Sequence, residues 1–129
     1  MFTLAHKQQL NDSGYCIIEG VLDQAEVAEV RARLVKAAAE SERRGIPTYI
    51  KGLDPDDRNV RVFNLLDLDP IFIELISHSL ALEIADHLLS GDFIVSNFTA
   101  NTAKPGSRSM VIHSDLAVVC QNPGMRPGA

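Results

Sequence analysis

The segment "VIHSDLAVV", residues 111–119, places metal-binding side chains in a strand-forming sequence. In an extended strand, residues i and i+2 point to the same side, so His113 and Asp115 would face one way and Ser114 the other. An imidazole and a carboxylate directed at one point are two of the three protein ligands of a non-haem Fe(II) site. An H-x-D pair alone is weak evidence, because a surface His and Asp at a strand edge would have the same spacing.

The segment that precedes the pair strengthens the metal-site interpretation. Residues 92–103, "DFIVSNFTANTA", are predicted to form a strand, and "KPGSR" joins it to the next predicted strand through a Pro-Gly pair suited to a type II turn. One side of this first strand would carry Val95, Asn97, Thr99 and Asn101. Such a row is typical of a polar pocket lining, and the alternative is a solvent-facing row on an antiparallel sheet.

The other three histidines are less convincing ligands. His6 lies in a polar N-terminal segment, where we expect it to be solvated. His78 lies at the predicted junction of two helices, where a cation would favour the end of the first, and His87 lies near the end of the second. We therefore predict helix-end roles for His78 and His87.

The rest of the chain predicts helices first and strands last. Helices are expected over about 3–11, 23–44 and, in two pieces broken near His78, 70–90. In the longest, Asp23 and Glu26 have the spacing of a capping box, and Glu29 can pair with Arg33 one turn later. A short strand is expected over 15–19, and a loop or short hairpin over 46–62. Asp69 is predicted to cap a helix that begins at Pro70. The apolar face of the long helix carries Val27, Val30, Leu34 and Ala38.

Composition limits the classes of protein to consider. With 129 residues and 46% apolar content, the chain can form one domain with a core, and its net charge of −5 argues against nucleic acid as a partner. No apolar run approaches the roughly 20 residues that span a bilayer, and the first residues do not resemble a signal peptide. Cys16 and Cys120 have no motif spacing and are predicted to be packing residues in a reduced, cytoplasmic setting.

The order of elements predicts a single α+β domain that is incomplete. It divides into a mainly helical part (1–91), strands (92–119) and a turn-rich tail (120–129). A few strands make a poor sheet by themselves, so their exposed edges could mediate self-association. On this interpretation the chain is truncated within its fold.

The segments "GYCIIEGVL", "RVFNLL" and "ISHSLALEIADHLLSGDFIVSNFTANTAKPGSRSMVIHSD", in this order, resemble the N-terminal half of a phytanoyl-CoA dioxygenase-like protein. The resemblance covers most of residues 10–119. Members of that family are Fe(II)- and 2-oxoglutarate-dependent oxygenases built on a double-stranded β-helix (a jelly-roll or cupin-like fold) with N-terminal helices packed against it. The resemblance implies a small-molecule substrate, 2-oxoglutarate and O₂ as partners, with no membrane or nucleic acid.

The resemblance also assigns roles to individual residues. His113 and Asp115 correspond to the first two iron ligands, and Asn97 and Thr99 are candidates for contacting 2-oxoglutarate or the substrate. The family's second ligand His and the Arg that binds the co-substrate lie further downstream than Ala129, and Arg126 is too close to Asp115 to be that Arg. The alternative is a non-catalytic module that uses the same fold to bind a small ligand or a partner.

Overall fold

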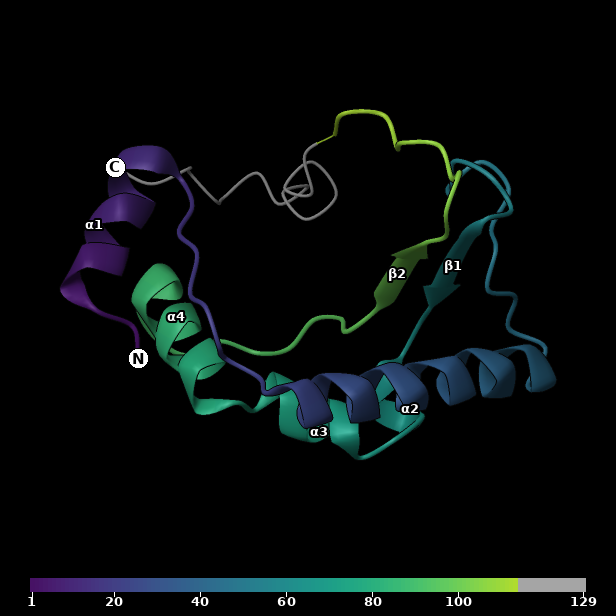
Figure 1. The fold of residues 1–129 in the computed structure, drawn as a ribbon, viewed down its shortest axis with the longest axis horizontal. Helices are drawn as coiled ribbons and strands as arrows, with labels where there is room; N and C mark the ends of the chain where they lie inside the picture. Colours follow the sequence, from purple (N-terminus) through teal and green to yellow (C-terminus); the bar gives the residue numbers. More distant parts are fainter. Residues whose placement is uncertain (114–129) are drawn as a thin grey trace.

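The computed structural model describes residues 1–113, and this part of the chain is a mixed α+β structure, as predicted. Four α-helices, a 3₁₀ helix and two strands follow one another within it (Figure 1). In chain order they are α1 (Leu4–Ser13), α2 (Gln24–Arg43), β1 (Asn59–Val62), η1 (Leu65–Asp67), α3 (Ile71–Ile76), α4 (Ser79–Leu89) and β2 (Ala100–Ala103).

Helix α2 begins where its capping residues predict. The Asp23 carboxylate accepts the backbone N–H of Glu26 at 2.8 Å, and the Glu26 carboxylate accepts the N–H of Asp23 at 2.7 Å. These reciprocal bonds satisfy two backbone donors that the first turn of a helix leaves without partners. One turn further on, Arg33 Nε lies 2.8 Å from Glu29 Oε1. Both predictions for this helix are confirmed.

The core lies where α2, β1 and α3 meet. Its buried members are Ala37, Val62, Leu65 and Phe72, and Phe72 and Val62 are each only 1% exposed. From the predicted apolar face of α2, Leu34 and Ala38 pack against this cluster, whereas Val27 remains 40% exposed. In Figure 1, α2 runs along one side of the two strands. The apolar face of α2 is therefore only partly covered within the described residues.

The sheet differs from the prediction in its pairing. Strand β1 pairs antiparallel with β2, with Asn59 opposite Ala103 and Val62 opposite Ala100. The predicted loop over 46–62 thus contains a strand whose partner lies about 40 positions downstream, in place of a short hairpin.

Three predicted strand segments are wrong in the part of the chain that the structure describes. Residues 15–19, 92–99 and 109–113 form no strand. A strand needs a hydrogen-bonded neighbour, and within residues 1–113 these segments pair with none. Ile17 and Ile112, for example, are 68% and 104% exposed. The strand predicted over 92–103 is reduced to β2, and residues 114–119 lie outside the described part.

The helix and turn boundaries agree more closely with the sequence. Helices α3 and α4 are separate, and the break falls at His78, as predicted. Asp69 Oδ1 accepts the N–H of Ile71 at 3.1 Å, although the helix begins one residue later than predicted. In the predicted turn, the N–H of Ser107 donates to the carbonyl of Lys104 at 2.9 Å, and Gly106 has a φ of +81°. These values confirm the type II turn.

Candidate metal centre

His113 lies at the end of the described chain with an exposed side chain whose Nδ1 is 2.8 Å from the carbonyl oxygen of Val111. Because a carbonyl oxygen can only accept, Nδ1 is the donor in this contact. Metal-binding histidines commonly donate one ring N–H to a backbone carbonyl in this way. The donor chemistry of His113 therefore fits a metal ligand. Asp115, its predicted companion, lies outside the described residues.

The other two predicted site residues contact each other. The Thr99 hydroxyl donates to the side-chain oxygen of Asn97 at 2.6 Å, so the two side chains point to the same side although residues 97–99 are not in a strand. Asn97 is exposed and Thr99 is half-buried. With its oxygen engaged by Thr99, the Asn97 amide presents an NH₂ group, which can donate to a carboxylate.

The three remaining histidines have structural roles at helix ends. His78 lies at a helix end, as predicted, but it caps the start of α4 rather than the end of α3. Its Nδ1 accepts the N–H of Leu80 at 3.2 Å. His87 lies in the last turn of α4, as predicted, with its ring 5.3 Å from that of buried Phe2. His6 is half-buried rather than fully solvated and forms a capping box with Thr3. Over residues 1–113, no three His, Cys, Asp or Glu side chains gather closely enough to hold a metal ion.

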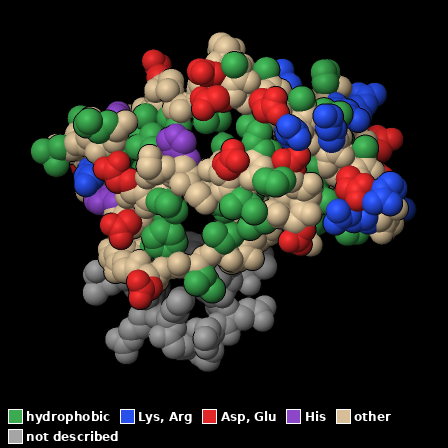
Figure 2. All heavy atoms as spheres, turned by 90° about the horizontal axis from the view of Figure 1, so that it is seen from below, with side chains coloured by type: hydrophobic (Ala, Val, Ile, Leu, Met, Phe, Trp, Pro, Cys, Tyr) green, Lys and Arg blue, Asp and Glu red, His purple; other side chains and the backbone are tan. Residues whose placement is uncertain are grey.

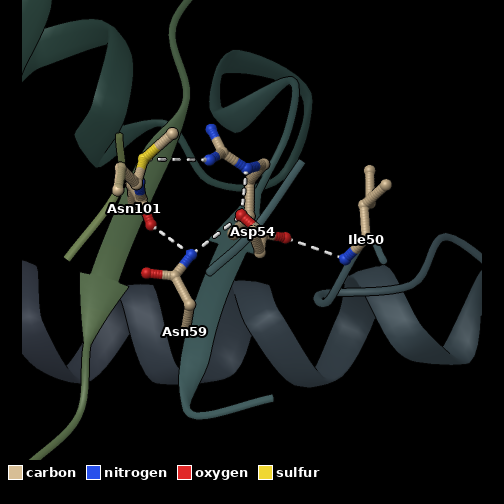
Figure 3. Close-up of polar contacts among 6 residues, drawn as sticks. Ile50, Asp54, Asn59 and Asn101 are labelled. Carbon is tan, nitrogen blue, oxygen red and sulfur yellow. Dashed lines mark hydrogen bonds and ion pairs between the residues drawn. The ribbon is translucent and has the colours of Figure 1, made fainter. Parts of the chain in front are cut away.

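A buried polar cluster, which the sequence did not reveal, lies beside the two strands (Figure 3). The Asp54 side chain is fully buried, and its Oδ1 accepts Arg61 Nε at 2.8 Å and Asn59 Nδ2 at 2.9 Å. Its Oδ2 accepts the N–H of Ile50 at 2.7 Å. The carboxylate thus has three donors, as a buried charge requires. The available sequence signal was the i, i+2 spacing of Asn59 and Arg61, which places both on one face of β1.

The cluster extends to the segment that leads to His113. Asn59 Nδ2 also donates to Asn101 Oδ1 on β2. The Met110 sulfur lies 3.7 Å from Asn101 Nδ2 and 4.0 Å from Arg61 Nη2, where it is a weak acceptor. Met110 is three residues before His113, so contacts from both strands converge close to the candidate ligand.

A second carboxylate holds the same segment nearer its start. Asp56 Oδ2 accepts the backbone N–H of Arg108 at 2.7 Å, and Oδ1 accepts the Ser107 hydroxyl at 3.2 Å and the N–H of Arg58 at 3.0 Å. The bond from Arg108 is the main cause of a lowered pKa for Asp56, because these donors stabilise the charged form. The structure therefore ties residues 104–110 to the loop that precedes β1.

No helix within residues 1–113 has both the length and the apolar character needed to cross a membrane.

Cys16, which was predicted to be a packing residue, is half-buried with a free thiol.

Comparisons with known proteins confirm the family that the sequence resembles. The family model for phytanoyl-CoA dioxygenase matches residues 10–129. "Dioxygenase af480" of Aspergillus fumigatus is 42% identical over 114 residues, which cover 88% of this chain but 37% of that protein. The chain thus spans little more than a third of this relative's length. No solved structure matches the chain. The family match and the identity to a dioxygenase show that the chain belongs to the phytanoyl-CoA dioxygenase family.

Proposed function

We propose that His113 and Asp115 are two of the three protein ligands of Fe(II) in a 2-oxoglutarate-dependent oxygenase. The observation that carries this proposal is the contact of His113 Nδ1 with the Val111 carbonyl, because histidines that bind a metal through Nε2 commonly donate the Nδ1 proton to a backbone carbonyl. Family membership and the similarity to a dioxygenase support it. Asp115 would add a negatively charged oxygen ligand on the same side of the metal.

In the complete enzyme, Fe(II) with O₂ and 2-oxoglutarate would insert one oxygen atom into a C–H bond of a small organic substrate, while 2-oxoglutarate is converted to succinate and CO₂. His113 and Asp115 would hold the metal, and other residues of this chain would orient 2-oxoglutarate and the substrate around it. We propose that the NH₂ group of Asn97, held by Thr99, donates to a carboxylate of 2-oxoglutarate or to the substrate.

The remaining parts of the site would come from elsewhere in such a longer protein. The dioxygenase relative extends well beyond the region of similarity, since 37% of its length is covered. We propose that the third iron ligand and an Arg for the distal carboxylate of 2-oxoglutarate lie in the corresponding region, outside residues 1–129.

We also propose that residues 1–129 belong to one domain in which β1 and β2 are strands of a double-stranded β-helix. The surface of α2 supports this, because a groove of about 790 Å³ lies between α2 and the strands. Large apolar side chains also remain exposed on both helices. Val35 on α2 is 68% exposed, and Ile73 on α3 is 50% exposed. Hydrophobic side chains are visible across the face that Figure 2 shows. Further strands would cover this surface, and without them the same surface and the sheet edges would favour self-association.

A metal titration tests the ligand assignment. In the full chain of 129 residues, Co(II) replaces Fe(II) as an air-stable probe with visible absorption. Loss of a residue that hydrogen-bonds to a metal ligand typically weakens metal binding about tenfold or more. We expect His113→Ala and Asp115→Ala, which remove a ligand itself, each to weaken Co(II) binding by at least this much. His78→Ala and His87→Ala are the controls, because these rings serve helix ends. Equal losses from all four substitutions would contradict the assignment.

An activity measurement separates the enzyme from a non-catalytic ligand-binding module. Residues 1–129 alone should not consume 2-oxoglutarate at an enzymatic rate, because a dicarboxylate would lack the bidentate Arg partner. A version of the protein that includes the region equivalent to the rest of the relative should produce succinate in an Fe(II)-dependent manner, and His113→Ala should abolish it. Iron-binding without succinate formation in that longer protein would favour the non-catalytic module.

A further inference from the structure

Two segments that are far apart in the sequence are joined side by side ahead of His113 in the chain. One is the loop and strand over 54–61, and the other is the connection over 104–110 between β2 and the candidate ligand. The N–H of Lys104 donates to the carbonyl of Arg58 at 3.0 Å, and Arg58 Nη1 donates to the carbonyl of Gly106 at 3.1 Å. The contacts of Asp56 and of Met110 continue this line of attachment.

Asp56 makes the shortest of these attachments, 2.7 Å from the N–H of Arg108. The bond is charge-assisted, so it is stronger than one between neutral groups. Beyond the turn at 104–107, residues 108–113 form no helix or strand. Their position therefore depends on side-chain attachments, and Asp56 spans a sequence separation of 52 residues to provide one.

The two residues before His113 contribute little packing. Val111 is 81% exposed and Ile112 is 104% exposed, so neither is buried against the described chain. The attachments before them therefore help to set where the chain arrives at His113. Asp56 fixes Ser107 and Arg108 in this way, and the weaker contacts of Met110 act next along the chain.

We propose that Asp56 is a positioning residue for the metal ligand His113, acting through the backbone of residues 107–110. This inference rests on the proposed function of His113. It predicts that removing the carboxylate releases the segment and weakens metal binding, although Asp56 itself is not a ligand.

Glu42 offers a closely matched control. Like Asp56, it accepts backbone N–H and hydroxyl donors, here one of each, both from Thr48 and both at 2.6 Å. Its pKa is lowered by the same kinds of bond as that of Asp56. Glu42 ties the loop after α2 to the helix, however, and makes no bond to residues 104–113 among the contacts described.

The first measurement is amide hydrogen exchange in the metal-free full chain, with Asp56→Ala compared with Glu42→Ala. We expect Asp56→Ala to accelerate exchange on the order of tenfold at Ser107 and Arg108, whose N–H groups are hydrogen-bonded, and to leave the amides of α2 unchanged. Glu42→Ala should not change exchange at these two amides. Unchanged exchange at both amides in Asp56→Ala would overturn the inference, whatever the result of the metal titration.

The second measurement is a Co(II) titration of the same two variants and of His113→Ala, with the Co(II) absorption spectrum recorded. We expect Asp56→Ala to weaken Co(II) binding roughly threefold to tenfold. Mutating a residue that bonds directly to a metal-binding side chain typically weakens metal binding about tenfold to hundredfold, and Asp56 acts less directly. Glu42→Ala should bind as the unmodified chain does. Unaltered Co(II) affinity and spectrum in Asp56→Ala, when His113→Ala does lose affinity, would overturn the positioning role alone. Unaltered affinity in His113→Ala would overturn the proposed ligand and this inference with it.

Discussion

Two regions of the molecule differ in how far apart in the sequence their bonded residues lie. One is helix α2, and the other is the pair of segments over 54–61 and 104–110. In α2, the capping box joins residues three apart and the Glu29–Arg33 pair joins residues four apart. In the paired segments, Asn59 bonds to Asn101 across 42 positions and Asp56 to Arg108 across 52. The helix follows from local chemistry, whereas the approach to His113 depends on contacts that form only when the chain has folded.

Removing Asp54 should have the largest effect, because its carboxylate is the centre of the buried polar cluster beside β1 and β2. Asp54→Ala leaves the Arg61 guanidinium, whose side chain is only 13% exposed, without its carboxylate. Loss of one partner of a buried ion pair typically costs about 3 kcal/mol or more. Urea unfolding should show this loss.

The control for Asp54 is Asp57→Ala, in the same loop but at an exposed position. We expect it to change the free energy of unfolding by less than about 0.5 kcal/mol, as surface substitutions usually do. If both substitutions had the same small effect, the cluster in Figure 3 would not stabilise the fold.

Removing the cap of α2 should have a smaller effect, confined to the local region. Asp23→Ala removes the acceptor for the N–H of Glu26, and loss of such a cap costs about 1 kcal/mol. Asp23→Asn should retain most of the stability, because Asn is an equally good cap. Circular dichroism during urea unfolding can compare the two, and equal losses from both substitutions would indicate that charge rather than capping is responsible.

The predictions from sequence succeeded where the contacts are local. The capping box, the break at His78 and the Pro-Gly turn each depend on residues within a few positions of one another. The strands over 15–19, 92–99 and 109–113 were wrong because alternation predicts an extended conformation but does not identify a partner. The role of Asp56 could not be predicted, because its partners Ser107 and Arg108 lie more than 50 positions away in the sequence. The partners of Asp54 lie within seven positions of it, but the sequence does not indicate which carboxylate of this loop is buried with them.

Acid should have the smallest effect, at the end of α2. Arg43 and Arg44 hold the pKa of Glu40 down to about 2 from 4.5, mainly through hydrogen bonds to its carboxylate. Arg43 Nη2 and Arg44 Nε lie 2.6 and 2.7 Å from Glu40 Oε1. Because the folded-state pKa is lowered, the stabilisation is present above pH 4.5 and is lost as the pH falls from there towards 2.

Thermal melts of the unmodified chain and of Glu40→Gln test this expectation. The two melting temperatures should differ slightly at pH 6 and converge as the pH falls below 4.5. A difference that stayed constant down to pH 3 would mean that the charge of Glu40 does not contribute.

The most direct test of the proposed metal centre is nuclear magnetic resonance of the four histidine rings during anaerobic addition of Fe(II) to the full chain. The His113→Ala spectrum assigns the His113 signals, and a paramagnetic ion shifts and broadens the signals of a ring that binds it. We predict that the His113 ring signals broaden first, while those of His6, His78 and His87 remain sharp because these rings lie at helix ends. Broadening of any of those three before His113, or unchanged His113 signals at saturating Fe(II), would contradict the assignment of His113 as an iron ligand.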